Sequence, residues 1–447
     1  MFEIESLLVA NRGEIARRVI RTAKRLGIRT IAVHSDVDAG LPFVLEADEA
    51  VLIGPANPAQ SYRNAEAVLA AAKQTGAQAI HPGYGFLSEN AEFARQVEAA
   101  GLLWVGPSPE AITAMGDKIN ARNLMAAAGV PVAPGTTDPA GSVEEALAEA
   151  ERIGFPVMIK AAAGGGGMGM APARDEATFR TEYDKVRGFA ERMFGDGSVL
   201  IEKFYPSVRH IEVQILGLAD GTVVALGERE CSVQRRNQKL VEESPSPASM
   251  LTPERRRALH ASAVRAGEAV GYRNAGTVEC LLDPATGDFF FLEMNTRLQV
   301  EHPITEAVFG IDLVEAQLRI AAGLPVEVPT TSTGHAIELR INAEDPKRFL
   351  PGPGAVTVWA EPAGLPGIRV DSGYAAGTTV TPNYDSLMAK LVAYGADRAE
   401  AIDRLRAAVA AFQIAGPKNN LPFFAELLEN EEFLSGDYDT AIVSRMR

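Results

Sequence analysis

The 447-residue sequence has few cysteines, a deficit of positive charge and no long hydrophobic run. Its two cysteines, Cys231 and Cys280, cannot form a disulfide framework and lack metal-ligand spacing, which favours a reducing compartment. The 43 Lys and Arg against 58 Asp and Glu argue against general binding to nucleic acid or to an anionic membrane. No apolar stretch has the length of a transmembrane helix, and the acidic N-terminus is unlike a signal peptide. We therefore expect a cytoplasmic protein.

The first third of the chain alternates strand-like and helix-like segments. Short apolar strands are predicted at 6–10, 30–34 and 79–81, and helices at 14–26 and 65–75. Strands that alternate with helices of this length predict a doubly wound parallel sheet. Ligands of such a sheet bind at the loops that follow its strands.

Turn-forming residues at 129–141 and 325–333 indicate boundaries between structural units. Between them a helix is expected at 252–270, with Thr252 as its N-cap. The strands predicted in this part lie at 156–160, 198–203, 210–217, 222–227, 276–282 and 289–295. A third unit is expected from about residue 334. The predicted class is α/β combined with α+β.

A glycine-rich loop follows the apolar strand that ends at Lys160. Its consecutive glycines, among them Gly165, Gly166 and Gly167, let backbone amides converge on an anion without interference from Cβ atoms. The loop is not a Walker A motif, because no Gly-Lys-Ser/Thr follows it, and it is a poor dinucleotide fingerprint. Lys160 would place an ammonium beside this phosphate cover. A flexible surface linker is the alternative interpretation.

Two predicted neighbouring strands carry Glu279, Glu293 and Asn295. Strand alternation puts Glu293 and Asn295 on one face. A carboxylate among the apolar residues there is costly unless it is paired or bound to metal. Two carboxylates and an amide oxygen suit Mg²⁺, which prefers oxygen ligands that it shares with phosphates. Strand-end carboxylates that face water are the alternative.

The segment after these strands has Arg297, Gln299 and Glu301 at alternate positions, which in an extended chain point to one side. A guanidinium fits a planar oxyanion such as bicarbonate in a bidentate way. The neighbouring carboxylate could accept the remaining proton of that anion. An exposed, salt-bridged loop would show the same pattern.

A further basic segment runs from Glu228 to Lys239 and includes Gln234 and Asn237. Its cations gather positive charge in an acidic protein, where the phosphates of a nucleotide would need it. A solvated basic turn is the alternative.

Six segments of the chain resemble, in the same order, those of biotin carboxylases, which are members of the ATP-grasp superfamily. They are Ala10-Asn-Arg-Gly-Glu-Ile-Ala16, His81-Pro-Gly-Tyr-Gly-Phe-Leu-Ser-Glu-Asn90, Met115-Gly-Asp-Lys118, Gln234-Arg-Arg, Glu293-Met-Asn-Thr-Arg-Leu-Gln-Val-Glu-His-Pro303 and Arg340-Ile-Asn-Ala-Glu-Asp-Pro346. The resemblance covers nearly the whole chain, and strings of this length are highly specific. It implies an N-terminal doubly wound domain, an ATP-grasp domain with a mobile glycine-loop lid at about 133–203, and a mixed α/β C-terminal domain. The implied bounds are 1–115, 116–330 and 334–447.

The resemblance also implies a role for each matching residue. The residues expected to bind ATP are Lys118, Lys160, Gly165, Gly166, Gly167, Glu202, Lys203, Tyr205, His210, Gln234, Asn237 and Leu281. Magnesium or manganese is expected at Glu279, Glu293 and Asn295. The residues expected around bicarbonate are Lys239, Arg297, Gln299, the backbone of Val300, and Glu301 as general base. Arg340, with Tyr84, is expected to face the ureido ring of biotin.

The implied reaction is that of an ATP-dependent carbon–nitrogen ligase, which activates bicarbonate as carboxyphosphate and carboxylates biotin. Since no Ala-Met-Lys-Met motif occurs, biotin is expected on a separate carrier protein, with a separate carboxyltransferase. The resemblance also implies a homodimer. It further implies that the chain is a subunit of an acyl-CoA carboxylase or of a related enzyme, for example a urea-type carboxylase.

Three residues depart from the family pattern. Ala163 and Met168 stand where many members have Gly and Arg, and Asn237 where many have His. Two alternatives remain: another ATP-grasp carbon–nitrogen ligase, and a catalytically silent structural subunit.

Overall fold

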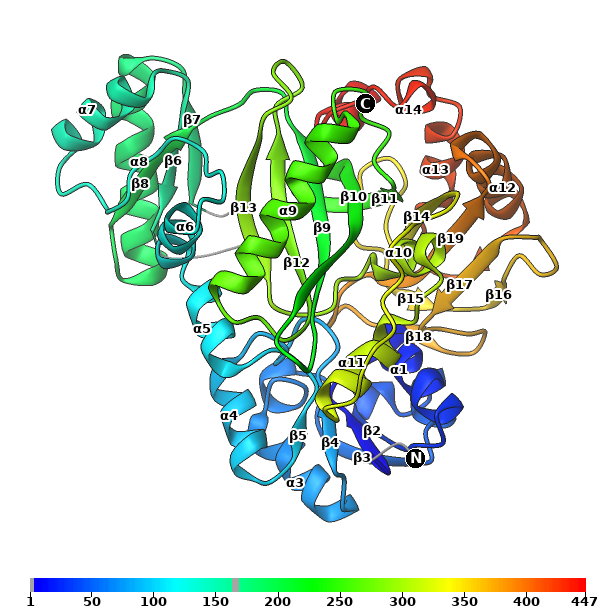
Figure 1. Ribbon diagram of the computed structural model, residues 1–447. Helices are drawn as coiled ribbons and strands as arrows, with labels where there is room; N and C mark the ends of the chain where they lie inside the picture. The colour runs from blue at the N-terminus through cyan, green and yellow to red at the C-terminus, as the bar shows by residue number, and fades with distance from the viewer. Residues whose placement is uncertain (1–3, 163–168) are drawn as a thin grey trace.

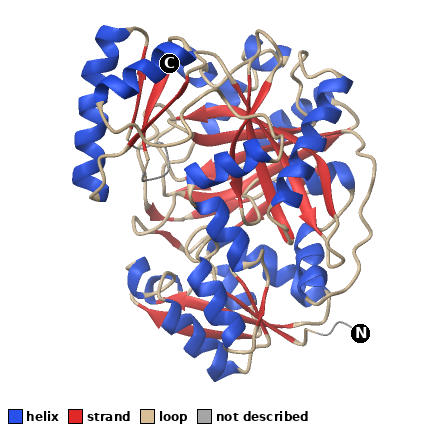
Figure 2. Cartoon of the chain, turned by 60° about the vertical axis from the view of Figure 1, so that its left-hand side comes forward, coloured by secondary structure: helices blue, strands red, loops and turns tan. Residues whose placement is uncertain are grey.

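The computed structural model describes residues 4–162 and 169–447 (Figure 1). The predicted nucleotide-binding glycines Gly165, Gly166 and Gly167, together with Ala163 and Met168, lie outside the described residues. Figure 2 shows the N-terminal sheet at the bottom, the large central sheet above it and a small sheet set apart at upper left. No helix of the described part is long and apolar enough to cross a membrane.

The N-terminal part is a five-stranded parallel sheet with the order β3-β2-β1-β4-β5. Its strands are β1 (Ser6–Val9), β2 (Arg29–Ser35), β3 (Glu49–Gly54), β4 (Ala79–His81) and β5 (Leu103–Trp104). Its helices are α1 (Gly13–Arg25), α2 (Pro42–Glu46), α3 (Ala65–Thr75), α4 (Ala91–Ala99) and α5 (Pro109–Gly116), with 3-10 turns at Asp36–Asp38 and Pro58–Gln60. The order reverses at β1, as in a doubly wound sheet, so the predicted class of this part is confirmed.

A small three-stranded antiparallel sheet with the order β7-β6-β8 forms the separate lobe at the left of Figure 1. It consists of β6 (Val157–Ala161), β7 (Met170–Ala173) and β8 (Val199–Lys203), with α7 (Val143–Ile153) and α8 (Glu176–Phe194) packed on it. The helix α6 (Lys118–Ala127) lies beside this lobe. The apolar faces of α7, α8 and the three strands form a core of their own. The lid at about 133–203 stays a prediction.

An eight-stranded antiparallel sheet dominates the rest, with the order β13-β12-β9-β10-β11-β14-β19-β17. Its strands are β9 (Arg209–Gly217), β10 (Val223–Arg235), β11 (Gln238–Ser244), β12 (Asn274–Leu282), β13 (Phe289–Asn295), β14 (His335–Asn342), β17 (Ile368–Ser372) and β19 (Leu387–Gly395). The pairing of β11 with β14 carries the sheet across the predicted boundary at about 334. This pairing brings the strand of Lys239 beside the strand of Arg340.

The remaining elements cover this sheet and close the C-terminal part. The helices are α9 (Pro253–Ala269), α10 (His302–Phe309), α11 (Leu313–Ala321), α12 (Arg398–Ala411), α13 (Leu421–Leu427), α14 (Glu431–Ser435) and α15 (Ile442–Arg445). Two-stranded sheets pair β15 (Gly354–Ala355) with β18 (Thr379–Val380) and β16 (Val358–Ala360) with β20 (Gln413–Ala415). Thr252 caps α9 as predicted, because its hydroxyl accepts the Arg255 amide.

A buried carboxylate on β11 ties the central sheet to the C-terminal helices. Glu243 accepts hydrogen bonds from Arg398 at 2.7 and 3.0 Å, lies 2.6 Å from Nε2 of His335, and accepts the hydroxyl of Tyr438. Although burial alone would raise the pKa of Glu243, Arg398 and His335 outweigh it and lower the pKa to about 2. The ionised carboxylate therefore stabilises the fold.

The variant Glu243→Gln is expected to unfold at a lower temperature than the wild type at pH 7, by a loss of about 3 kcal/mol. Because the pKa in the fold is depressed, this contribution is present above the ordinary value near 4.5 and is lost as the pH falls toward 2. Thermal unfolding measured between pH 7 and pH 3 should therefore show the two midpoints converge. A constant gap would contradict the assigned ionisation, and Glu429→Gln, at an exposed carboxylate, is the control.

Candidate active site

One face of the central sheet carries polar side chains on three adjacent strands. The register places Glu212 of β9 opposite Glu279 of β12, and Glu279 opposite Glu293 of β13. Because alternate residues of a strand share a face, His210 and Gln214 lie beside Glu212. These residues form the floor of the candidate active site.

The side chain of Lys239 reaches this floor from β11, which β10 separates from β9. Its ammonium donates hydrogen bonds to Glu212 at 2.6 Å, Glu279 at 2.8 Å and Glu301 at 2.7 Å. Burial disfavours the charged amine, but the three carboxylates outweigh it and raise the pKa of Lys239 above its ordinary value. The structure thus brings the predicted cation and the predicted base into direct contact.

Glu301 lies between two cations and is fully buried. One carboxylate oxygen accepts from Lys239 at 2.7 Å, and the other accepts from Arg340 at 3.0 Å. Burial alone would raise the pKa of Glu301, but Lys239 and Arg340 outweigh it and hold the pKa well below its usual range. Glu301 is therefore ionised at neutral pH, the form that a proton acceptor needs.

The segment with Arg297 and Gln299 was predicted to be extended, and this is wrong: it is a bend that ends in a turn at Glu301, the N-cap of α10. The side chains nevertheless meet. Arg297 donates to Gln299 at 3.0 Å and to Asn295 at 3.0 Å, and Gln299 donates to Glu279 at 3.0 Å. The hydrogen bonds of this turn, rather than strand alternation, thus bring the side chains together.

The other side of the Glu301 carboxylate holds the residues expected to face biotin. Nε of Arg340 donates to Glu242 at 2.6 Å, while its Nη2 reaches Glu301. Burial raises the pKa of Tyr84, and the adjacent Glu14, whose carboxylate accepts the Tyr84 hydroxyl, raises it further. The charge of Arg340 lowers the pKa of Tyr84, but burial and Glu14 outweigh it. Tyr84 therefore stays a neutral hydroxyl at neutral pH.

The predicted metal ligands Glu279 and Glu293 face each other across β12 and β13, and Asn295 lies on the same face. Glu279 is already paired with Lys239 and with His210, whose Nε2 lies 3.0 Å away. Among the described residues none donates a hydrogen bond to the side-chain carboxylate of Glu293. Burial and the charge of Glu279 raise the pKa of Glu293. A cation between the two carboxylates would relieve this repulsion.

The predicted nucleotide residues fall on both lobes. In the small lobe, Lys160 of β6 forms an ion pair with Glu202 of β8. The backbone amide of Lys203 donates to Pro134 at 2.7 Å, so it is not free for a ligand. The ring of Tyr205 stacks on Phe290 of β13 at 5.1 Å.

The other predicted nucleotide residues lie at the edge of the floor. Leu281 lies opposite His210 in the sheet register. Lys118 begins α6 and its charge acts on Glu293. Gln234 and Asn237 belong to the β10–β11 hairpin, and Asn237 is exposed at its tip with a positive φ of 65°. The basic segment is therefore mainly strand rather than a solvated turn.

Three family models together match most of the chain. Residues 3–112 match "Biotin carboxylase, N-terminal domain", residues 117–328 match "Carbamoyl-phosphate synthase L chain, ATP binding domain", and residues 338–445 match "Biotin carboxylase C-terminal domain". The chain is 48% identical to a biotin carboxylase of Haemophilus influenzae over 437 residues, which are 97% of this chain and 96% of that protein. The chain belongs to the biotin carboxylase family.

Two solved structures of biotin carboxylases have the same fold. The Campylobacter jejuni enzyme, in a complex with a β,γ-ATP compound, has a TM-score of 0.95 and 43% identity over 99% of both chains. The biotin carboxylase domain dimer of Hydrogenobacter thermophilus 2-oxoglutarate carboxylase, bound to MgADP, ADP and bicarbonate, has a TM-score of 0.92 and 44% identity over 99% and 97%. The predicted family, fold class and enzyme class, an ATP-dependent ligase, are confirmed.

The biotin carboxylase fold also holds buried ionic residues that the sequence did not reveal as parts of the site. Arg229 is fully buried and lies opposite Glu212 on the same face of the sheet, where it donates to Glu212 at 2.5 Å and to Gln214 at 2.7 Å and so holds both side chains in place. Glu242 and Glu338 form a cross-strand pair beside Arg340. Alternation of polar with apolar residues from His210 to Ile215 in β9 was a signal that could have identified Glu212.

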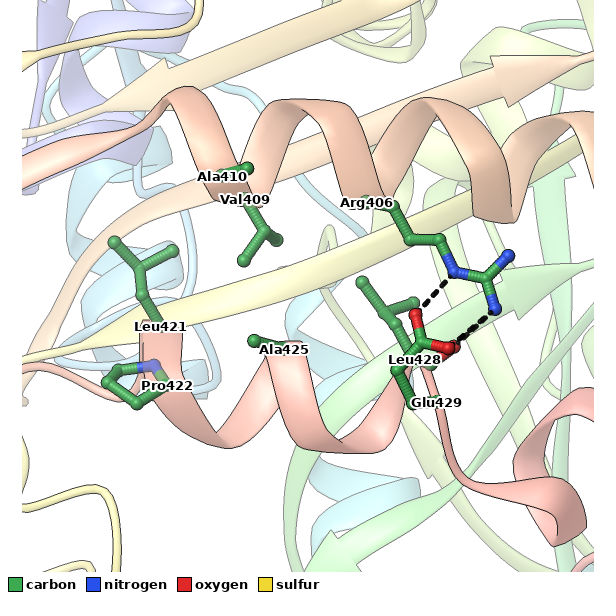
Figure 3. A pocket seen from close by; sticks show the side chains of 8 residues that line it. All are labelled: Arg406, Val409, Ala410, Leu421, Pro422, Ala425, Leu428 and Glu429. Atoms are coloured by element: carbon green, nitrogen blue, oxygen red, sulfur yellow. Dashed lines mark hydrogen bonds and ion pairs between the residues drawn. The ribbon is translucent and has the colours of Figure 1, made fainter.

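A cavity of about 320 Å³ lies away from these residues, between α12 and α13 (Figure 3). Val409, Leu421 and Leu428 line it, and an ion pair of 2.8 Å joins Arg406 to Glu429 at one end. None of the predicted site residues lines this cavity, so it is not part of the candidate active site.

Proposed function

We infer that this site binds MgATP and bicarbonate and carboxylates a biotin held by a separate carrier protein. The observation that carries this inference is the contact of the Glu301 carboxylate with both Lys239 and Arg340. An ionised acceptor between two cations suits an anion that must bind and then lose a proton. The likeness to the Hydrogenobacter domain, whose structure holds MgADP and bicarbonate, supports the same ligands here.

The residues present fit the implied magnesium or manganese ion. Glu279, Glu293 and Asn295 offer oxygen atoms, which are the ligands such ions prefer. Glu293 is the clearest sign, because its half-buried carboxylate has a raised pKa and accepts no hydrogen bond from a described residue. A bound ion would neutralise charge on the ATP phosphates. Lys118 and Lys160, with the glycines of the lid, would contribute the remaining contacts to ATP.

For bicarbonate, we assign binding to Arg297, Gln299, Lys239 and the Val300 backbone. A bicarbonate oxygen attacks the γ-phosphorus, the bond to the β-phosphate oxygen breaks, and ADP leaves. Glu301 accepts the bicarbonate proton in this step, and the product is carboxyphosphate. The lid keeps water from this reactive compound.

Arg340 and Tyr84 would then act on biotin. Carboxyphosphate separates into CO₂ and phosphate, and the phosphate accepts the N1′ proton of the ureido ring. The guanidinium of Arg340 stabilises the resulting anion, which forms a bond from N1′ to CO₂. The position of Arg340 beside Glu301 supports a shared pocket for both half-steps.

The partners that we propose are a biotin carboxyl carrier protein, a carboxyltransferase and a second copy of this chain. The dimer of the Hydrogenobacter relative supports the last of these. The relatives of this chain include subunits of pyruvate carboxylase and of propionyl-CoA carboxylase, which have different acceptors. We propose that this chain serves an acyl-CoA or related carboxylase.

The test is ADP release by the purified protein with MgATP. We expect turnover to require bicarbonate and to rise when free biotin is added. Turnover with bicarbonate that biotin does not stimulate would instead indicate another ATP-grasp carbon–nitrogen ligase. Nucleotide binding without any turnover would indicate a silent subunit.

A further inference from the structure

Two consecutive carbonyl groups of the turn before α10 are held by buried side chains. Nδ1 of His302 lies 2.8 Å from the Gln299 carbonyl oxygen, and the ammonium of Lys390 donates to the Val300 carbonyl at 2.9 Å. Since a carbonyl only accepts, Nδ1 of His302 carries the proton. Both side chains are fully buried. The orientation of both peptide groups is therefore fixed from inside the protein.

In a trans peptide the N–H points opposite to the C=O of the same plane. The Gln299 carbonyl shares its plane with the Val300 amide, and the Val300 carbonyl shares its plane with the Glu301 amide. Holding the carbonyls toward His302 and Lys390 therefore turns the two amides away from these side chains. Within residues 4–162 and 169–447 neither amide donates a hydrogen bond. Two adjacent free amides are a binding surface for an anion.

Lys390 reaches this turn from β19 and connects it with two other regions. Its ammonium lies 3.1 Å from Glu14 at the start of α1 and 3.9 Å from Asp371 of β17. Glu14 in turn accepts the hydroxyl of Tyr84. Lys390 thus contacts the turn before α10 directly. Through Glu14 it is also connected to Tyr84, the residue expected to face biotin.

The energetics argue that this arrangement is more than packing. A buried ammonium is costly unless carboxylates and acceptors satisfy it. Asp371 already has Arg369 as a partner at 2.6 Å, so Glu14 is the contacting carboxylate that depends on Lys390. The Val300 carbonyl likewise has Lys390 as its donor among the described residues. A methionine would fill the same space but would leave this carbonyl without a donor.

We propose that Lys390 is a positioning residue for bicarbonate, which acts by orienting the Val300–Glu301 peptide so that its amide and the Glu301 carboxylate meet the anion together. His302 acts in the same way on the preceding peptide. This role rests on the proposed function, since it requires that the anion at the turn is bicarbonate. It lies outside the set of residues that touch substrate.

The test is steady-state ADP release by Lys390→Met, with bicarbonate and ATP varied separately. We expect the KM for bicarbonate to rise about tenfold, because a displaced anion site loses contacts that ATP does not use. The KM for ATP should stay within about twofold of the wild type. Unchanged KM values, or a fall of kcat alone, would overturn the positioning role.

A second variant guards against loss of the fold. Lys390→Met combined with Glu14→Gln removes the ammonium together with its nearest carboxylate, so no buried charge of the pair is left alone. It should unfold near the wild-type temperature and still show the raised KM for bicarbonate. A KM restored to the wild-type value in this variant would overturn the proposal.

The control is Lys418→Met, at a surface lysine paired with Asp345 and 66% exposed, which should leave both KM values unchanged. Failure of the proposed function is distinguishable, because the wild type itself would then show no bicarbonate-dependent turnover. A wild type that turns over normally, with a Lys390→Met variant that behaves identically, refutes only the role of Lys390.

Discussion

Replacement of Glu301 by glutamine is expected to lower kcat for bicarbonate-dependent ADP release by about 10²–10⁴-fold. Glutamine has nearly the same shape but cannot accept the bicarbonate proton. Lys160 and Glu202, on the other lobe, pair with each other rather than with Glu301. Nucleotide affinity, measured by calorimetry with MgADP, should therefore change little.

The matched control for Glu301→Gln is Glu429→Gln, the same substitution at an exposed ion pair of the C-terminal part. It should retain full turnover. A Glu301→Gln enzyme with more than about a third of wild-type kcat would show that another group accepts the proton. Loss of the fold would count equally against the assigned role.

Replacement of Arg340 by alanine is expected to lower biotin carboxylation by about 10²–10³-fold, the usual cost of removing one group that stabilises developing negative charge. ATP binding should remain largely intact. The substitution also removes the cation that faces Glu242. Burial raises the pKa of Glu242 to about 7, although Arg340 partly opposes this rise. Glu242 should therefore bind a proton more tightly in the variant. The measurement is incorporation of labelled bicarbonate into biotin over a range of pH.

The control for Arg340→Ala is Arg406→Ala, an arginine that pairs with Glu429 beside the cavity between α12 and α13. This control should carboxylate biotin at the wild-type rate. Carboxylation by Arg340→Ala at near the wild-type rate would contradict the role of the guanidinium in stabilising the ureido anion.

The N-terminal sheet was predictable because its signals are local: apolar strands and amphipathic helices alternate at regular spacing. The strand β11 was not predicted, and β10 was expected to end at 227 rather than at Arg235. Both strands contain charged residues, such as Glu230 and Glu243, that are fully buried. The charges of these residues break the apolar pattern of a strand, and their partners come from distant segments. The sequence therefore predicted a polar segment here instead of two buried strands.

The candidate site was predictable to the extent that its residues lie in long family motifs. Glu301, Arg297 and Lys239 were placed together by that resemblance, and the structure shows Lys239 and Glu301 in contact. Lys390 was not found, because nothing near it in sequence shows that it reaches Val300, 90 residues away. A single charged residue within the apolar strand β19 was the available signal.

We propose that a bicarbonate oxygen attacks the γ-phosphate of ATP at this site. The most direct test is turnover of ATP with ¹⁸O-labelled bicarbonate, over a time short against exchange of its oxygens with water. Attack by bicarbonate transfers a labelled oxygen to the phosphate that is released, so we predict labelled phosphate by mass spectrometry. Unlabelled phosphate would show that water attacks ATP, and it would contradict the assignment of Lys239, Glu301 and Arg340 to bicarbonate activation.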